Sequence, residues 1–289
     1  MGTEDRRALR ILVVVGHPHD FTHCAGTCGI HTARGDSVTV VSITDGSSTH
    51  NERLHDELLK PEKERDARVI NQTAQEYAEG KAREFRKVCA LFGVTDARVL
   101  AFPQPFRLKE RPEAVEALRD IMYDVRPHVL ITQSPYLSGP HGMASAAYDD
   151  HGEAARTVME AKALAAVPDY VTKERPHTIA ATYYLGIYFM RDEIDFYVDI
   201  SEWKEQRVQA EGLFRSQGHT DAFALRRVEI AAGNIGWYAG TAYAESFVRA
   251  VPEVLPRIIV AESALKRASE PRENHMKRLA GALEKDSVK

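Results

Sequence analysis

The sequence predicts an α/β protein: a Rossmann-like, doubly wound and mostly parallel sheet that is followed by a C-terminal extension. A continuous run of apolar, mostly β-branched residues at 11–15 is typical of a strand buried on both faces. Over the first 170 residues, such runs alternate with segments of helical length, which is the pattern of a parallel sheet covered by helices. Ligands bind such sheets beyond the carboxyl ends of the strands, so functional residues are expected there.

The first part of this pattern is regular. Segment 23–34 has helical length and small residues that allow close packing on a sheet, and Gly35 ends it. The β-branched run 37–43 is the next strand, and the polar segment 45–60 is expected to be a long loop. The elements expected next are a charge-rich helix at 62–92, a strand at 98–102, a helix at 112–125, a strand at 128–132 and a helix at 150–167.

The chain after residue 170 is less regular. The elements expected there are strands at 178–189 and 196–200 and helices at 202–216, 221–237 and 254–267. Because no linker divides the chain, we expect one domain over residues 1–289. Its core is expected at about 9–170 and its C-terminal extension at about 171–289.

Composition and charge exclude several classes of protein. Lys and Arg total 38 against 42 Asp and Glu, which gives a net charge of −4 at pH 7. A protein that mainly binds nucleic acid needs a basic surface, so we expect no nucleic-acid partner. The sequence shows neither a long apolar span nor a secretory signal, and three cysteines are too few for a disulfide scaffold. We expect a cytoplasmic protein without a membrane partner, and we also expect a homo-oligomer.

The residues after the first expected strand carry a compact group of polar side chains. Gly16-His17-Pro18-His19-Asp20 places two imidazoles and a carboxylate within four residues. A hydrolytic zinc site takes three nitrogen or oxygen ligands and keeps a further position for water, and a turn can aim His17 and Asp20 inward. The segment after strand 128–132 offers the candidates for a third ligand: His141, Tyr148, Asp149, Asp150 and His151. From spacing alone, these groups could equally be solvated polar residues of a loop.

Several short motifs occur in an order that is known from one family. The first is Gly16-His17-Pro18-His19-Asp20-Phe21, followed by Gly26-Thr27, Arg34-Gly35 and Thr44-Asp45-Gly46. Later motifs are Tyr148-Asp149-Asp150-His151, Phe214-Arg215-Ser216-Gln217 and Ala244-Glu245-Ser246-Phe247. In order and spacing they resemble the PIG-L / LmbE-like zinc-dependent N-deacetylase family over residues 11–247. The resemblance implies a metal-dependent hydrolysis of N-acyl groups on amino sugars and related amines.

The resemblance also implies site residues. His17, Asp20 and His151 match the metal ligands of the family, and all three are present. The family's general base, an Asp, is replaced by His19. A motif His, thought to stabilise the oxyanion or to protonate the leaving group, is replaced by Tyr148. The Asp that precedes the third ligand is kept as Asp150.

A linear substrate is expected rather than an amino sugar. The family has an Asp after the third strand that helps to hold the sugar, and this chain reads Phe102-Pro103-Gln104-Pro105 there. His141, between glycines, is a candidate for lining the substrate pocket, although a surface position is as good an interpretation. Asp45, at the end of the second strand, is expected to shape the site, although it could equally cap the turn.

The chemistry of amide hydrolysis can survive these replacements. A neutral imidazole can act as a general base near pH 7, so His19 is the first candidate, with Asp149 or Asp150 as the alternative. Tyr148 could donate a hydrogen bond to the tetrahedral oxygen. We expect a zinc-dependent N-deacetylase or amidohydrolase that acts on a non-peptide C–N bond, although this ligand set also suits other divalent metals. Alternatively, His19 is a fourth metal ligand, and the chain is a catalytically weak, metal-dependent binding or regulatory protein.

Two further interpretations concern the same region. His23, Cys24 and Cys28 could form a thiolate metal site, but their spacing favours the buried face of a helix. A nucleotide-binding dehydrogenase is disfavoured, because histidines and a proline occupy the turn where a Gly-x-Gly-x-x-Gly motif would lie.

Overall fold

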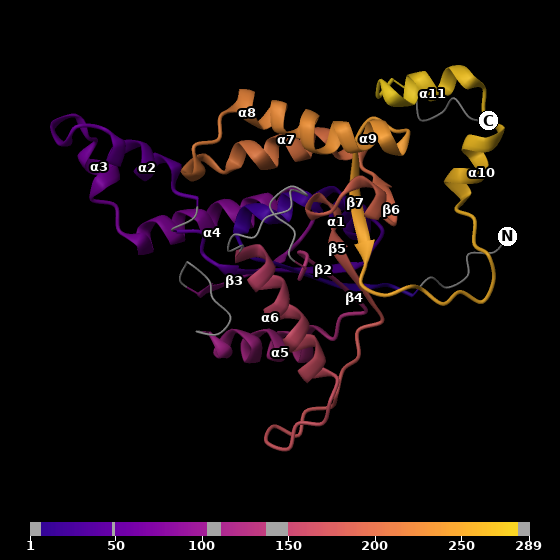
Figure 1. Ribbon diagram of the computed structural model, residues 1–289, viewed down its shortest axis with the longest axis horizontal. Coiled ribbons are helices and arrows are strands. Elements are labelled where there is room, and N and C mark those ends of the chain that lie inside the picture. The colour runs from indigo at the N-terminus through magenta and orange to yellow at the C-terminus, as the bar shows by residue number, and fades with distance from the viewer. Residues whose placement is uncertain (1–6, 48–49, 103–110, 137–149, 283–289) are drawn as a thin grey trace.

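The computed structural model describes residues 7–47, 50–102, 111–136 and 150–282, and the α/β fold class is confirmed. Its seven strands form one sheet in the order β3-β2-β1-β4-β5-β7-β6 (Figure 1). Strands β1 to β5 pair in parallel, whereas β7 runs antiparallel to both β5 and β6. The strands are β1 (Arg10–Val15), β2 (Ser37–Thr44), β3 (Asp96–Phe102), β4 (Val129–Thr132), β5 (Ala181–Leu185), β6 (Phe196–Asp199) and β7 (Ala244–Arg249).

Helices cover both faces of the sheet, because the side chains of β1 alternate between two apolar layers (Figure 1). Leu12 and Val14 lie in the layer formed with α5 and α6. Val13 and Val15 lie in the layer formed with α1, α4 and α7. These helices are α5 (Pro112–Val125), α6 (Asp150–Ala165), α1 (Ala25–Ala33), α4 (Ala74–Leu91) and α7 (Lys204–Leu213).

The strand order reverses beside β1, and this places the site. From β1 the chain builds outward through β2 and β3 on one side and through β4 and β5 on the other. In such sheets, the crevice between the two strands at the reversal collects ligands at their carboxyl ends. His17 follows β1 and Gln133 follows β4, so both residues lie at this crevice.

Most elements expected in the first 170 residues are confirmed, with two corrections. Segment 45–60 is not wholly a loop, because α2 (Glu52–Leu59) forms within it and the side chain of Asn51 caps its first turn. The helix expected at 62–92 is divided into short turns, α3 (Ala67–Ile70) and α4. Thr73 and Glu76 form a capping box there, which starts α4 at Ala74.

The extension departs further from expectation. The strand expected at 178–189 is shorter, because β5 covers only five residues. Strand β7 was not expected as a strand at all, because its six residues mix polar and apolar side chains without a clear alternation. The helix expected at 254–267 begins only at Glu262. The helices of this region are α8 (Asp221–Val228), α9 (Asn234–Ala239), α10 (Glu262–Ser269) and α11 (Arg272–Leu279), and a π-helical turn, Glu229–Gly233, joins α8 to α9. Among the helices that the structure describes, none is both long and apolar enough to span a bilayer.

Strand β7 ties the extension to the first helix. Glu245 is 3% exposed and accepts hydrogen bonds from the backbone N–H groups of Gly26 (2.9 Å) and Thr27 (2.8 Å) and from the Thr27 hydroxyl (2.7 Å). The amides in the first turn of α1 have no partner within the helix, and a carboxylate at this end also opposes the positive pole of the helix dipole. The extension therefore fixes the helix that follows the first motif.

Replacing Glu245 with Ala should lower the free energy of unfolding by about 3 kcal/mol or more, because buried Arg207 and the first turn of α1 lose their partner. Urea unfolding monitored by circular dichroism measures the change. Glu205→Ala, on the exposed side of α7, is the matched control and should change the free energy by about 0.5 kcal/mol at most. Equal losses in both variants would contradict this role.

Candidate metal centre

The turn after β1 holds the first two candidate ligands. A short 3-10 helix, Pro18–His23, begins there, and the backbone N–H of His17 donates a hydrogen bond to Asp20 Oδ2 over 2.9 Å. Nδ1 of the His17 imidazole lies 3.1 Å from the same oxygen. Both side chains are buried, so the turn presents one imidazole and one carboxylate at the end of the strand.

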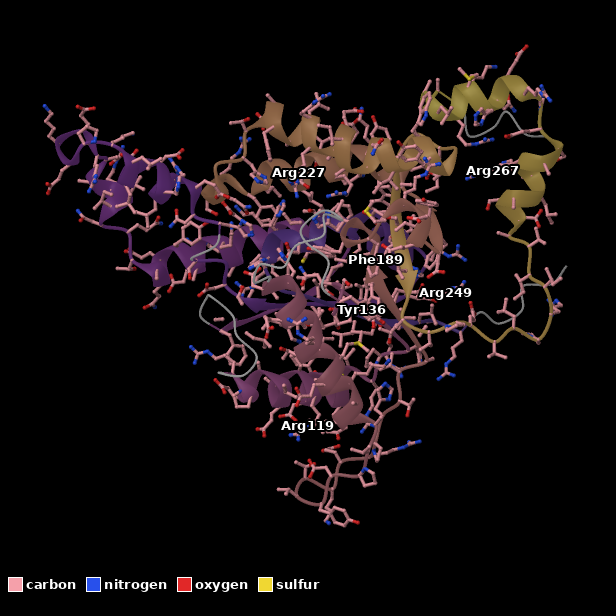
Figure 2. All side chains as sticks on the ribbon, viewed as in Figure 1. Arg119, Tyr136, Phe189, Arg227, Arg249 and Arg267 are labelled. Carbon is pink, nitrogen blue, oxygen red and sulfur yellow. The ribbon has the colours of Figure 1, made fainter. Side chains whose placement is uncertain are left out.

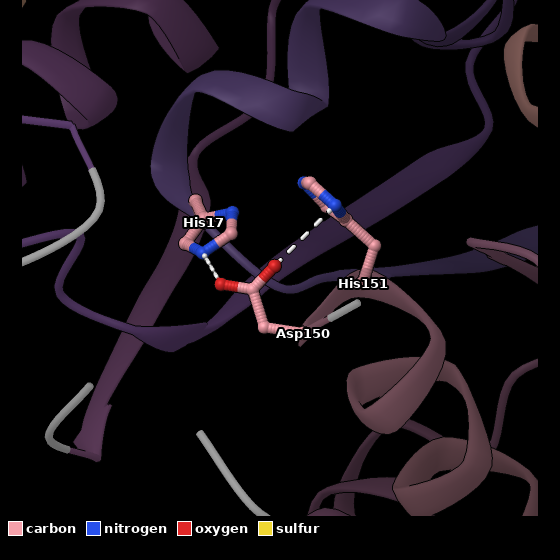
Figure 3. Close-up of side chains that lie close together, drawn as sticks. All are labelled: His17, Asp150 and His151. Carbon is pink, nitrogen blue, oxygen red and sulfur yellow. Dashed lines mark hydrogen bonds and ion pairs between the residues drawn. The ribbon is translucent and has the colours of Figure 1, made fainter. Parts of the chain in front are cut away.

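The start of α6 supplies the third candidate ligand and a second carboxylate. Asp150 Oδ2 lies 3.0 Å from Nε2 of His17 (Figure 3). Nε2 of His151 lies 3.5 Å from Oδ1 of Asp20. The two imidazole rings meet edge to face, 4.9 Å between their centroids. Ligand atoms of His17, Asp150 and His151 all lie within 4.8 Å of one another. The structure thus brings together His17, Asp20 and His151 and adds Asp150 to them.

Gln133 is a further hydrogen-bond partner of Asp20. Its Nε2 donates to Asp20 Oδ2 (2.8 Å), and its Oε1 accepts from the backbone N–H of Gly16 (2.8 Å). The amide also contacts the hydroxyl of Tyr188 at 3.0 Å. The sequence analysis missed Gln133, although its place directly after a buried strand was a signal for it.

The groups of this cluster stabilise the charged forms of one another. Burial raises the pKa of Asp20, but the imidazoles of His151 and His17 outweigh it and hold that pKa well below its usual value. Burial lowers the pKa of His17, but Asp20 and Asp150 more than offset this and raise it. Burial likewise raises the pKa of Asp150, and its bond to His17 brings the net pKa below the ordinary value. The two carboxylates are therefore ionised and favour positive charge between them.

His19 belongs to a second cluster. Its Nε2 lies 3.0 Å from Oε2 of Glu211 on α7, and His219 completes the group. Burial lowers the pKa of His19 to about 4, and Glu211 only partly opposes this effect. Burial raises the pKa of Glu211, but His19 and two arginines hold it well below the usual range. At neutral pH His19 is thus an uncharged imidazole that donates its Nε2–H to Glu211, which leaves Nδ1 as the basic nitrogen.

The remaining predicted residues are placed as follows. Asp45 accepts a hydrogen bond from the backbone N–H of Ser47 (2.8 Å), so it caps its own turn. His141, Tyr148 and Asp149 lie outside the described residues. The core interpretation of the two cysteines agrees with the structure, because Cys24 and Cys28 are fully buried in the apolar layer with α4.

A polar pocket of about 240 Å³ joins the two clusters. His50, which the sequence analysis missed, stands between them: its ring centroid is 4.9 Å from that of His17 and 6.3 Å from that of His19. The pocket is lined by His19, Asp20, His23, His50, Glu52, His151, Tyr188, Gln217, His219, Phe223 and Arg227. The candidate ligands Asp20 and His151 therefore line the same pocket as His19 and His219.

Comparison with known proteins identifies a family. The family model described as PIG-L: GlcNAc-PI de-N-acetylase matches residues 12–162, just over half of the chain. A 1D-myo-inositol 2-acetamido-2-deoxy-alpha-D-glucopyranoside deacetylase from Streptomyces griseus is 30% identical over 199 residues, 63% of this chain and 56% of that protein. The chain thus spans about half the length of such curated relatives.

Solved structures share the fold. N,N'-diacetylchitobiose deacetylase from Pyrococcus horikoshii has a TM-score of 0.63 at 19% identity over 84% of each chain. The 4-carboxy-2-hydroxymuconate hydratase GalB from Pseudomonas putida has a TM-score of 0.65 at 19% identity, over 86% of this chain and 99% of that one. The family match runs from β1 through most of α6 and so includes both segments that carry the candidate ligands. The resemblance seen in the motifs is therefore confirmed, and the chain belongs to the PIG-L family.

Proposed function

We propose that this protein is a metal-dependent hydrolase that removes the acyl group from a linear N-acyl amine, a non-peptide C–N bond. The observation that carries the proposal is the convergence of His17, Asp20 and His151 from two segments about 130 residues apart. The deacetylases among its relatives support the reaction class. The linear substrate rests on the sequence after β3, where the sugar-holding Asp of the family is replaced.

The cluster fits a divalent cation. Imidazole nitrogens and carboxylate oxygens suit zinc, our first candidate, as well as other divalent metals. Two ionised carboxylates flank His17 and favour positive charge at this point. We assign His17, Asp20 and His151 as the ligands, and Asp150 is close enough to bond the His17 ring or to join them. A bound divalent ion would lower the pKa of water and polarise the acyl carbonyl.

The residues around the candidate ligands are candidates for orienting a ligand, for acting as the general base and for binding the tetrahedral oxygen. Gln133 fixes Asp20 through a bond at one carboxylate oxygen, which orients the ligand group. Asp150 is ionised and can accept a proton, so it is one candidate for the general base. His19 is the other, because Glu211 holds its ring and leaves Nδ1 unprotonated. Tyr148 remains our candidate donor to the tetrahedral oxygen, and Asp45 and His141 remain candidates for shaping or lining the substrate pocket.

A binding or regulatory protein is the second candidate function. The low pKa of His19, about 4, makes its imidazole a weak base, and this favours a catalytically weak protein that retains the metal. The two candidates differ in turnover and not in metal content, so they can be separated by measuring both.

Replacing His151 with Ala should abolish metal retention and activity together, because the cluster loses its contribution from α6. The measurement is metal content by mass spectrometry alongside release of the acyl group. His55→Ala, a change at an exposed histidine, is the control and should keep both properties. Full metal content in the His151 variant would refute the ligand assignment.

Replacing His19 with Ala should leave metal content unchanged and lower kcat by about 100-fold or more if His19 is the base. Its contacts are with Glu211 and His219, so its loss should not disturb the ligands. Asp150→Asn is the companion variant, and a fall in kcat there with metal content unchanged identifies Asp150 as the base instead. Loss of metal in the His19 variant would show that His19 is a ligand and would favour the binding protein.

We also propose that the chain forms a homo-oligomer through its C-terminal extension. The segment between β7 and α10 exposes apolar side chains, of which Val254 is 96% and Ile258 90% accessible. A second copy of this chain would remove them from water. Val254→Glu combined with Ile258→Glu should shift the mass measured by light scattering to that of the monomer. A wild-type protein that is itself monomeric at high concentration would contradict the proposal.

A further inference from the structure

The far end of the pocket holds an arginine whose guanidinium is largely unused. Arg227 lies on α8 one turn after Phe223, where α8 meets the body of the protein (Figure 2), and both side chains line the pocket. The Arg227 side chain is only 21% exposed, and its single close charged neighbour among the described residues is Oε2 of Glu211, 3.3 Å from Nε. Its Nε is buried and makes no hydrogen bond within the part of the chain that the structure describes. Among the described residues, no side chain or backbone group forms a hydrogen bond with its two terminal nitrogens. The hydrogen-bonding fork of Arg227 is thus available to a ligand.

Arg227 is not the only partner of the Glu211 carboxylate. The same carboxylate accepts from His19 and lies 3.5 Å from Nη1 of Arg207. Arg207 in turn lies 3.5 Å from Glu245. Glu211 therefore lies beside the Nε edge of Arg227 as an ion-pair partner, and the two terminal nitrogens have no such partner among the described residues. A guanidinium with these two nitrogens available is suited to bind a planar anion through two parallel bonds.

Gln217 contributes a second donor at this end. Lys81 is fully buried, and its Nζ donates a hydrogen bond to Gln217 Oε1 over 2.8 Å. An ammonium group has only protons to offer, so the amide oxygen must face Lys81 and the NH2 group must face away from it. Gln217 lines the pocket, and its NH2 group has no hydrogen-bond partner among the described residues. A buried lysine thus leaves the NH2 group as the available end of Gln217, in a side chain that lines the same pocket as Arg227.

A second metal ion is a poor occupant for this end. His19, Glu211 and His219 could together offer three ligand atoms. However, the guanidinium groups of Arg207 and Arg227 both lie within 3.5 Å of the Glu211 carboxylate and would repel a divalent cation. The charges and donors at this end favour an anion instead.

We propose that the pocket end formed by Arg227 and Gln217 binds an anionic oxygen group of the substrate, a carboxylate or a phosphate. This inference rests on the proposed function and specifies the substrate class: an N-acyl amine that carries the anion a few bonds from the amide nitrogen. The candidate metal ligands Asp20 and His151 line the same pocket, so one small molecule would place its amide at one end and its anion at the other.

The test compares anionic and neutral substrates of matched length on the metal-loaded, full-length protein. N-acetyl-β-alanine and phosphorylated N-acetylethanolamine carry the two anions, and N-acetyl-β-alaninamide and N-acetylethanolamine are their neutral counterparts. Calorimetry gives Kd, and acetate release gives KM and kcat. We expect the wild type to favour an anionic compound over its neutral counterpart by about tenfold or more in Kd and KM, with a smaller effect on kcat. The preferred anion distinguishes carboxylate from phosphate.

Variants on α8 assign this preference to one side chain. Arg227→Gln should bring the anionic-to-neutral ratio close to one, and Arg227→Lys, which keeps the charge but not the fork, should give an intermediate ratio. Arg226→Gln removes the same charge from the adjacent, exposed position and should keep the wild-type ratio. If melting curves show that Arg227→Gln is unfolded, Arg227→Lys and Gln217→Glu decide, since the latter replaces the amide donor with a carboxylate that repels the anion.

The outcomes separate this inference from the proposed function. Equal Kd for anionic and neutral compounds in the wild type, or an unchanged ratio in Arg227→Gln, would overturn the anion site even if acetate is released. Selective anion binding that depends on Arg227, with no acetate released from any compound, would uphold the anion site and contradict the hydrolase.

Discussion

The carboxylate of Asp20 is the contact on which the arrangement of the site depends. It joins the turn after β1 to His151 on α6 and to Gln133 after β4, three segments that the sheet brings to one edge. A buried carboxylate is costly unless its oxygens accept hydrogen bonds and face positive charge. The partners that meet this demand are the imidazoles that would hold a cation, so the interactions that stabilise the fold here also position the candidate ligands.

A second buried carboxylate, Glu211, does not favour a bound cation, because its neighbours already carry positive charge. Asp20 faces imidazoles and an amide, which leaves positive charge to be supplied from outside the protein. Glu211 already faces Arg207 and Arg227, so its charge is met within the protein. One pocket thus has an end that favours a cation and an end that favours an anion, although both ends are built around a carboxylate between histidines.

The sequence was sufficient to predict every strand of the sheet except β7 and to name the candidate ligands, because these depend on local patterns. The apolar run of β1 and the His17 and Asp20 that follow it lie within eleven residues, and His151 lies in the first turn of α6, within a recognisable motif. Arg227 and Glu211 could not be found in this way, since each lies in an ordinary amphipathic helix, and only the tertiary fold turns them toward His19. Strand β7 was missed for a related reason, because its identity as a strand depends on pairing with β5 and β6.

The C-terminal extension supplies residues at the far end of the pocket, which the ligand motif does not include. Arg207 and Glu211 lie one turn apart on α7, and Arg207 continues to Glu245 on β7, which holds the first turn of α1. A chain of alternating charges therefore runs from the far end of the pocket to the helix that follows the first motif. Because the candidate ligands come from the core, residues 17–151, and the proposed anion-binding groups from the extension, changes in the extension can alter which amine enters the pocket while the candidate ligands stay the same.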